Sequence, residues 1–466
     1  MTCTIIWFRR DLRLHDNPAL HWACENSDRV IPVYIHAPHE EEPWAPGAAS
    51  RWWLSGSLQQ LDQALSQYGL TLHQFTGDSA RVLTEICQAS GARNLVFNHL
   101  YEPHLAKRDH QLGKQLETLG IQIHSFHSRL FFQPGSILNN QGMPYRVYTP
   151  FYRKARGLLD TLYGHYQPLN SHGHLKTLKP VTSVLTLADQ PVKLLDEHPW
   201  HDKLHQHWQP GEQHGHDILD QFIDHRIGDY VEGRDIPSMD GTSRLSPYLH
   251  FGELSVQQIY LVLQPLLAGA LGSKAMDAAE RFLSQLIWRE FAHHILWHYP
   301  QSSVKPMNTR FSNRFWKSNK NHFNRWTQGT TGVAIVDAGM KQLWETGWMH
   351  NRVRMIVASY LTKNLGIGWL QGARWFWDTL VDADLANNSM GWQWVAGCGV
   401  DAAPYFRIFN PLTQTKRFDN ESKYIDHWVP EHNKQDYPQP LVDLSASREQ
   451  ALQRYKQHTS RQDLLL

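Results

Sequence analysis

Cysteine is scarce in this chain of 466 residues, which has only four, at positions 3, 24, 87 and 398. Their spacing matches neither a disulfide framework nor a zinc motif, so we expect no metal site and a reducing compartment. Long hydrophobic runs are also lacking. The apolar residues 4–8 are followed at once by arginine, unlike a signal peptide, and no stretch approaches the ~18 apolar residues of a membrane span. We therefore expect a soluble, cytoplasmic protein.

Net charge is nearly absent, since Lys and Arg number 45 against 44 Asp and Glu, a formal total of +1. This balance neither indicates nor excludes a nucleic-acid partner, because binding depends on a local basic patch. The abundant residue is tryptophan, with 19 copies. Most such side chains fill cores and interfaces, and the others are candidates for redox or base-stacking positions.

The first 130 residues alternate short β-rich runs with amphipathic segments. Strands are predicted at residues 4–8, 30–35, 71–75, 94–97 and 121–126, with helices at 57–68 and 78–90. This alternation is typical of a doubly wound parallel sheet, which binds ligands at the carboxyl ends of its strands. No GxGxxG occurs, so a conventional dinucleotide fingerprint is excluded.

The remaining chain divides into two parts. Residues 131–210 are punctuated by proline without a sustained period, which predicts a long irregular connector whose histidines fit a solvated segment better than a metal site. The rest is helical, with long amphipathic segments predicted at 276–298, 333–346, 348–364 and 372–381. The predicted fold is an α/β domain (1–130), a connector (131–210) and an all-α domain (211–466).

Two short motifs of the helical half place polar groups beside an aromatic ring or a helix start. Residues 241–247 (GTSRLSP) combine hydroxyls with Arg244, which suits either a phosphate or an ordinary helix cap. Gln285 and Trp288 are three residues apart and share a helix face. That pair can hold a flat polar ring, or it is a buried tryptophan beside a capping amide.

A third motif lies within residues 348–355. Asn351 and Met355 share one helix face, and Met355 is either core or a soft surface against a base. Arg352 and Arg354 diverge from that face. One of them can meet a phosphate outside while the other pairs with an internal acid.

A fourth motif, residues 382–394 (DADLANNSMGWQW), joins two carboxylates, two amides and two tryptophans around a glycine. Neighbouring carboxylates invite general acid–base chemistry. No metal-ligand set and no Ser/His or Cys/His nucleophile is nearby. The cluster therefore indicates a cofactor that carries the chemistry. Basic and aromatic residues interleave at 310–320 and 406–417, as on a nucleic-acid surface, although each charge alone fits a solvated face.

Together these motifs resemble the DNA photolyase/cryptochrome family, and most closely its class I cyclobutane pyrimidine dimer photolyases. The resemblance spans nearly the whole chain and is carried by residues 7–20, 241–247, 288–291, 346–363, 382–394 and 401–411. It implies an α/β domain, a connector and a helical domain that holds FAD. It also implies that a monomer repairs UV-damaged DNA in light, when reduced FAD passes an electron to a flipped-out pyrimidine dimer and the dimer splits.

The resemblance implies roles for individual residues as well. The residues expected to contact FAD are Tyr230, Thr242, Ser243, Arg244, Leu245, Ser246, Arg354, Asp382, Asp384 and Asn388. Within that set Arg354 and Asp382 resemble an ion pair beside the flavin, and Asn388 resembles the residue that faces flavin N5. The residues expected to carry electrons to the flavin are Trp316, Trp369 and Trp392. The catalytic pocket for the dimer is expected to contain Gln285, Trp288, Asn351, Met355 and Trp394. The expected DNA-backbone contacts are Arg234, Arg352 and Arg407.

One residue departs from the family pattern, because Gln285 stands where class I enzymes usually place a glutamate. A glutamine hydrogen-bonds a pyrimidine but cannot transfer a proton to it, which favours slower repair or a compensating group. The alternative is a cryptochrome-like blue-light photoreceptor with weak or no repair activity. A flavin-free DNA-binding protein does not explain the set of Arg354, Asp382 and Asn388.

The family also binds a second, light-harvesting chromophore in or beside the α/β domain. Arg51, Asn98 and Glu102 lie where such contacts are expected. Leu100 replaces the acid that deazaflavin binders tend to have, so 5,10-methenyltetrahydrofolate is the predicted antenna.

Overall fold

The computed structural model describes residues 2–179, 192–195, 199–311, 315–402 and 406–460. Its N-terminal part is built on a sheet of five parallel strands in the order β3-β2-β1-β4-β5. The strands are β1 (Cys3–Phe8), β2 (Arg29–His36), β3 (His73–Thr76), β4 (Asn94–Asn98) and β5 (Gln122–Phe126). The predicted doubly wound α/β architecture is confirmed.

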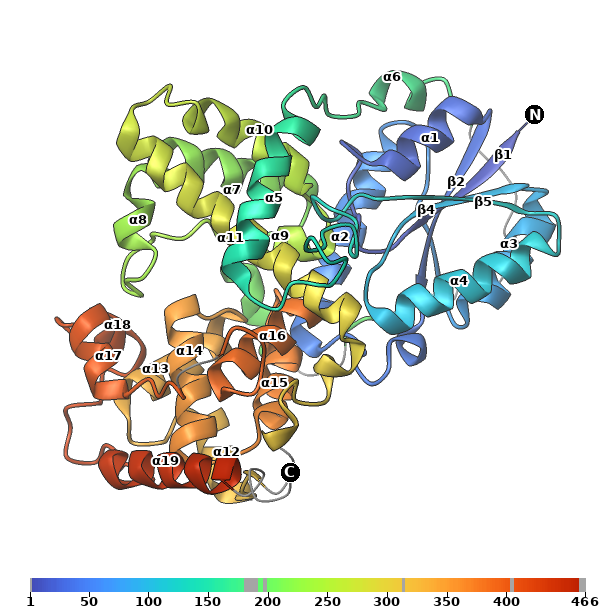
Figure 1. Cartoon of the computed structure of the whole chain (residues 1–466). Coiled ribbons are helices and arrows are strands. Elements are labelled where there is room, and N and C mark those ends of the chain that lie inside the picture. The colour runs from blue at the N-terminus through green and yellow to red at the C-terminus, as the bar shows by residue number, and fades with distance from the viewer. Residues whose placement is uncertain (1, 180–191, 196–198, 312–314, 403–405, 461–466) are drawn as a thin grey trace.

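Successive side chains of β1 point alternately to the two faces of this sheet. Ile6 and Phe8 pack toward α1 (Pro18–Asn26) and α2 (Ala48–Ser66), whereas Ile5 and Trp7 pack toward α3 (Ser79–Ser90) and α4 (Pro103–Glu117). All four strand residues are at most 1% exposed, as expected of a parallel strand covered by helices on both faces. Figure 1 shows the sheet edge-on between these helices.

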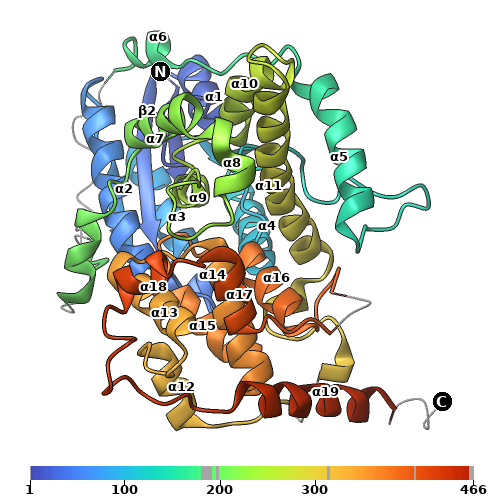
Figure 2. The same cartoon turned by 90° about the vertical axis from the view of Figure 1, so that its left-hand side faces the viewer.

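The prediction of an irregular connector was wrong for residues 148–163, which form the helix α5 (Tyr148–Tyr163). Phe151, Ala155, Leu159 and Tyr163 recur every four residues and are all buried. Pro150 falls in the first helical turn, where proline is tolerated, so the proline-rich flank concealed the period. Figure 2 shows α5 alongside the long helix α11 (Ser273–His298), against which the Phe151 ring packs through Phe291 at 5.2 Å. Of the connector histidines, His198 lies outside the described residues.

The α/β domain also contains the short helix η1 (Pro38–Glu41). The elements between α5 and α11 are α6 (His172–Leu175), η2 (Pro199–Gln206), α7 (Glu212–His225), η3 (Ile227–Asp229), α8 (Tyr230–Gly233), α9 (Ser246–Phe251) and α10 (Val256–Leu267). After α11 follow η4 (Pro300–Ser303), η5 (Thr309–Phe311), α12 (Lys320–Thr327), α13 (Ala334–Thr346), α14 (Asn351–Ser359), a π-helical turn η7 (Tyr360–Asn364), α15 (Trp369–Thr379), α16 (Leu385–Ala396), α17 (Pro411–Phe418), α18 (Lys423–Trp428) and α19 (Leu444–Ser460).

Several predicted helices have different bounds in the structure. The one predicted at 57–68 is the second half of α2, which begins at Ala48 and ends at Ser66. The segment predicted as one helix over 348–364 begins at Asn351, because the ring nitrogen Nδ1 of His350 accepts a hydrogen bond from the backbone N–H of Arg352 and caps the helix. It changes to a π turn after Ser359. The helix predicted at 372–381 begins earlier, at Trp369, and ends at Thr379. Among the described helices, none combines the length and the apolar character required to cross a lipid bilayer.

Candidate functional site

A cavity of about 740 Å³ opens in the helical domain between α11, α14 and α16. This volume falls in the range of roughly 300–1,000 Å³ typical of ligand pockets. All residues predicted for the catalytic pocket line it, namely Gln285, Trp288, Asn351, Met355 and Trp394. So do many predicted contacts of the flavin or of DNA, namely Arg234, Arg352, Arg354, Asp382, Asp384 and Asn388. Trp392, predicted to carry electrons, also lines the cavity. Motifs separated by about a hundred residues in the sequence therefore meet in one cavity.

The predicted ion pair between Arg354 and Asp382 is present. Arg354 Nη2 lies 2.8 Å from Asp382 Oδ2, and Ser246 Oγ donates to the same oxygen at 2.7 Å. The guanidinium is held in place because its Nε donates to the carbonyl of Met349 at 2.7 Å. The other oxygen of Asp382, Oδ1, is buried and has no hydrogen-bond partner among the described residues. Since buried oxygens normally accept a hydrogen bond, this one is available to a ligand donor.

Asp384 caps α16 and faces two histidines. Its Oδ1 accepts from the backbone N–H of Asn387 at 2.9 Å, and its Oδ2 lies 3.4 Å from His293 Nε2 and 3.7 Å from His250 Nδ1. Burial alone would raise the pKa of Asp384, but the two histidines outweigh burial and hold that pKa well below its usual range. The cavity wall therefore carries a permanent negative charge at this position.

The α16 face of the cavity has room for a flat group. Asn388 donates from Nδ2 to the carbonyl of Ala373 at 2.9 Å, which fixes its amide in the wall. One turn further on, a Cβ added to Gly391 would meet no atom within 4 Å. A cradle with an unpartnered carboxylate oxygen, an arginine and an open glycine fits FAD, with Arg354, Asp382, Asp384 and Asn388 as the residues that would hold it.

Tyr148 is a cavity residue that sequence reasoning missed. Its ring stacks on Trp288 with a centroid separation of 3.5 Å and an interplanar angle of 9°, and its hydroxyl donates to the carbonyl of Ser284 at 2.7 Å. Because Tyr148 begins α5, which was predicted as irregular, no local pattern pointed to it. Trp394, which also lines the cavity, donates from Nε1 to the carbonyl of Asp401 at 3.2 Å, and the guanidinium of Arg407 lies 5.2 Å from the Trp394 ring.

Polar pairs line the cavity on the side of α8. Arg234 Nη2 donates to Gln285 Oε1 at 3.1 Å, and Arg352 Nη2 lies 2.8 Å from Asp235 Oδ1. Arginine has only donors, so the amide oxygen of Gln285 must face Arg234. One hydrogen of its NH₂ group donates to the carbonyl of Arg281 at 3.4 Å, which leaves the other hydrogen for a ligand.

Three tryptophans predicted to carry electrons are arranged along α15. A Cβ on Gly372 would lie 2.1 Å from Cη2 of Trp392, and a Cβ on Gly368 would lie 3.5 Å from Cγ of Trp316. Trp369 stands between these two glycines on the same helix. Trp392 and Trp369 are both 3% exposed, while Trp316 is half-buried. The two glycines thus let Trp392, from the cavity, and Trp316, from nearer the surface, approach α15, which carries Trp369.

The predicted phosphate-binding segment lies next to this cavity rather than in its wall. Ser246 reaches it through the hydrogen bond to Asp382, whereas Tyr230 and residues 242–245 are not among the described lining residues. Tyr230 is buried against Phe222 and Phe282, with ring centroids 5.5 Å away in each case.

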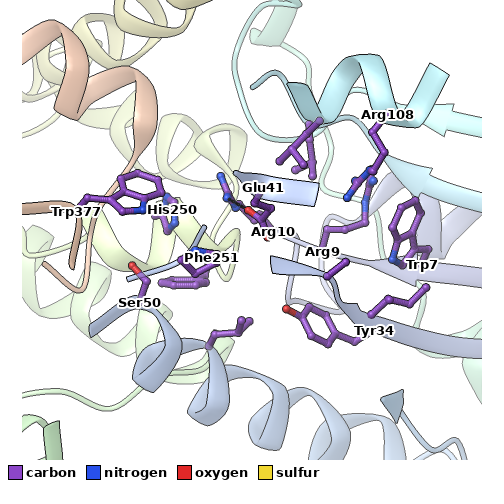
Figure 3. Close-up of a pocket in the computed structure, with 16 residues that line it drawn as sticks. Trp7, Arg9, Arg10, Tyr34, Glu41, Ser50, Arg108, His250, Phe251 and Trp377 are labelled. Atoms are coloured by element: carbon purple, nitrogen blue, oxygen red, sulfur yellow. Dashed lines mark hydrogen bonds and ion pairs between the residues drawn. The ribbon is translucent and has the colours of Figure 1, made fainter. Parts of the chain in front are cut away.

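A second cavity, of about 40 Å³, lies where β1 and β2 end and the helical domain begins. Figure 3 shows Arg10 and Glu41 in its wall, with His250 and Trp377 on the side of the helical domain. It has room for only a few water molecules. The described residues that line it do not include Arg51, Asn98 or Glu102.

The three predicted antenna residues make contacts inside the protein. Asn98 Nδ2 donates to Asp11 Oδ2 at 2.6 Å, and Glu102 is paired with Arg10 and Arg129. Arg51 Nε donates to the carbonyl of Leu194 at 3.0 Å. The antenna assignment therefore stays a prediction.

Comparisons with known proteins agree with this geometry. A family model described as DNA photolyase matches residues 4–170, and one described as the FAD binding domain of DNA photolyase matches residues 282–435. The deoxyribodipyrimidine photo-lyase of Agrobacterium fabrum is 40% identical over 97% of this chain and 97% of its own length. Cryptochrome-1 of Arabidopsis thaliana is 35% identical over 92% of this chain and 63% of its own length.

Solved structures give the same assignment. A bacterial class III photolyase from Agrobacterium tumefaciens superposes with a TM-score of 0.91 at 39% identity, over 99% of this chain and 98% of that one. A cryptochrome from Synechocystis superposes with a TM-score of 0.87 at 27% identity, over 97% and 99% of the two chains. The cavity, its acidic and aromatic wall and these matches show that the chain belongs to the DNA photolyase/cryptochrome family and carries that family's FAD-binding domain.

Proposed function

We propose that this protein repairs cyclobutane pyrimidine dimers in DNA, in light, with reduced FAD held in the large cavity. The observation that carries the proposal is the convergence of two kinds of wall in one space. A charged wall of Arg354, Asp382 and Asp384 suits the flavin, and an aromatic and amide wall of Trp288, Trp394 and Asn351 suits a flat, carbonyl-rich lesion. Bound FAD, once reduced and excited by light, supplies the electron that opens the cyclobutane ring.

The residues of the chain bind the damaged DNA and present the dimer. Arg234, Arg352 and Arg407 would contact backbone phosphates, which supply most of the affinity for a duplex. The dimer would leave the stack and enter the cavity, a step made easier because two crosslinked neighbouring bases of one strand stack poorly. Trp288, backed by the Tyr148 ring, and Trp394 would receive its apolar edge and exclude water.

Hydrogen bonds would fix the polar edge of the dimer. The NH₂ group of Gln285 faces away from Arg234 and suits a pyrimidine carbonyl. Asn351 offers a second amide, and Met355 a soft apolar surface beside it. Negative charge that develops on the dimer is stabilised by donors already in place. Gln285 holds no proton that it can transfer, so it acts here by hydrogen bonding alone.

Trp316, Trp369 and Trp392 would pass electrons from the surface toward the cavity and restore reduced FAD. The half-buried Trp316 would be outermost, and Trp392, which lines the cavity, would be innermost. For the antenna, 5,10-methenyltetrahydrofolate is the proposed chromophore, and the absorbance of whatever is released on denaturation tests that identity.

Illumination of the purified, reduced protein with an oligonucleotide that contains a single dimer tests the proposal. Light should convert the dimer to two intact thymines, detected by chromatography, whereas a dark sample should not change. Undiminished dimer in light, from protein that carries reduced FAD, would reject repair. That outcome would favour the second candidate, a blue-light photoreceptor, which the similarity to Cryptochrome-1 supports.

A further inference from the structure

A continuous series of ion pairs, partly buried at its outer end and buried at its inner end, runs from the α/β domain to the wall of the large cavity. Glu41 Oε2 lies 2.7 Å from Arg10 Nη2, and Arg10 is also paired with Glu102. Glu102 Oε1 lies 3.3 Å from Arg129 Nη1, and Arg129 Nη2 lies 4.0 Å from Asp384 Oδ2. The series alternates in sign from Glu41 to Asp384, and we call it the interdomain charge chain.

The sheet positions the inner members of this chain. Arg10 follows β1, Glu102 precedes α4, and Arg129 follows β5, so all three lie at the carboxyl ends of parallel strands. Their side chains are 11%, 2% and 1% exposed, and that of Asp384 is 6% exposed. Glu41 and Arg10 form part of the wall of the small cavity in Figure 3, while Asp384 forms part of the wall of the large one.

Because they are buried, charges that are not direct neighbours in the interdomain charge chain still interact. Water and salt screen exposed charges within about 10 Å, but buried groups are screened much less. Other charged or titratable groups also face Asp384: His250 and His293 contact its Oδ2, and the buried Arg289 donates to the carbonyl of Arg129 at 2.8 Å. Oδ2 of Asp384 accepts no hydrogen bond from the described residues. Because Asp384 lines the large cavity, its charge contributes to the potential at a group bound there.

We propose that Arg10, Glu102 and Arg129 are positioning residues that set, through Asp384, the reduction potential of the flavin in the large cavity. The inference rests on the proposed binding of FAD there. The α/β domain then does more than support the helical domain, because its charges contribute to the electrostatic potential at the cofactor. Removing the negative charge of Glu102 leaves Arg10 and Arg129 with a surplus of positive charge, and positive charge favours reduced flavin.

Replacement of Glu102 by glutamine (Glu102→Gln) tests this. In a spectroelectrochemical titration without DNA, the ratio of reduced to oxidised flavin at a fixed potential should rise about tenfold, which is roughly 30 mV for a two-electron couple. Glu41→Gln, two links further from Asp384, should shift the ratio in the same direction by less. The matched control is Glu40→Gln. Glu40 lies in the same domain and is paired with Arg108 at 2.9 Å, but it does not belong to the interdomain charge chain. The flavin reduction potential of this variant should equal that of the wild type.

An unchanged potential in folded Glu102→Gln protein, or an equal shift in the Glu40→Gln control, would overturn the inference. If Glu102→Gln does not fold, the comparison of Glu41→Gln with Glu40→Gln decides, and the absence of a difference overturns it. If the wild-type protein repairs the dimer but the variants show no shift in flavin potential, the role of the interdomain charge chain is rejected and the proposed function is not. A wild-type protein that binds no FAD would reject the proposed function as well.

Discussion

The guanidinium of Arg354 and the carboxylate of Asp382 join α14 to the segment that leads into α16, with Nη2 and Oδ2 2.8 Å apart. Two donors, Arg354 and Ser246, use the same carboxylate oxygen, and this leaves the buried Oδ1 without a partner among the described residues. An acid arranged in this way holds a neighbouring cation and still accepts a hydrogen bond from a ligand.

Asp382→Asn should therefore weaken flavin binding. The substitution keeps the shape but removes a charged acceptor, and hydrogen bonds to charged groups contribute about 1.5–3 kcal/mol, so retention should fall about tenfold or more. The ratio of flavin to protein absorbance after gel filtration measures it. Asp378→Asn is the matched control, because Asp378 lies on α15 outside the described cavity wall and accepts from the backbone of Ala48. Full flavin content in Asp382→Asn would contradict the assignment.

Trp392→Phe should block photoreduction of oxidised flavin. Trp392 lines the cavity and packs on α15 against Gly372 and Phe376, and phenylalanine keeps an aromatic ring that is far harder to oxidise than an indole. The rate of flavin bleaching under blue light with an external reductant measures the effect. Trp22→Phe, on α1 of the α/β domain, serves as the control. Photoreduction at the wild-type rate in Trp392→Phe would remove this residue from the electron path.

Gln285→Ala should reduce the affinity for dimer-containing DNA about tenfold, because it removes an amide donor that Arg234 holds in orientation. A binding titration on damaged and undamaged duplexes separates this loss from a general loss of DNA binding. Equal weakening on both duplexes would show that the residue does not contact the lesion. In the same series, Gln285→Glu reports on proton supply: faster repair means that proton supply limits the wild type, and an unchanged rate means that another group compensates.

Gly372→Ala should destabilise the fold by about 1–3 kcal/mol, the usual effect of overpacking a core. Its Cβ would lie 2.1 Å from Trp392 and 2.7 Å from Leu361 Cδ2, so one of these side chains must move. Gly157→Ala, in the exposed part of α5, is the matched control, since a Cβ there meets nothing within 4 Å. It should stabilise by roughly 0.5–1 kcal/mol through helix propensity. Denaturant unfolding measures both, and equal effects of the two substitutions would contradict the packing argument.

Acid should destabilise the protein through its buried histidines. Burial lowers the pKa of His294 to about 4, whereas the unfolded chain has the ordinary value of about 6.5. The unfolded state thus binds a proton first as the pH falls, and the contribution present above pH 6.5 is lost between about pH 6.5 and 4. At pH 5 this one residue accounts for about 2 kcal/mol.

His294→Gln tests that sign. Glutamine does not titrate and still offers a donor to the carbonyl of Tyr145, which His294 contacts at 3.2 Å. The loss of unfolding free energy between pH 7 and 5 should be smaller in this variant than in the wild type. His205→Gln, at an exposed position, is the control. The same pH dependence in His294→Gln and wild type would refute the assignment.

Much of the cavity was predictable because its residues belong to local motifs. Gln285 and Trp288, or Asn351 and Met355, share a helix face by spacing alone, and the structure places each pair in the same wall. The doubly wound sheet was predictable for a similar reason, since strand–helix alternation is a local pattern.

The features that could not be predicted from the sequence are contacts between residues far apart along the chain. Tyr148 stacks on Trp288, and Glu102 meets Arg129 and Arg10, but no periodicity links such residues. The helix α5 was missed because Pro144 and Pro150 resemble a loop, although buried apolar residues recur behind them. The antenna site shows the same limit, because Asn98 and Glu102 have internal partners that only the tertiary structure reveals.

The stacking of Tyr148 on Trp288 has a bearing on how this protein can be divided. A fragment that begins at residue 211 keeps Trp288 but loses the ring that covers it, together with Glu102 and Arg129. The helical half alone therefore lacks part of the cavity wall and of the charges beside it. Transplanted alone, it would present an indole bare to solvent, and only the two pieces recombined in trans would rebuild the complete cavity.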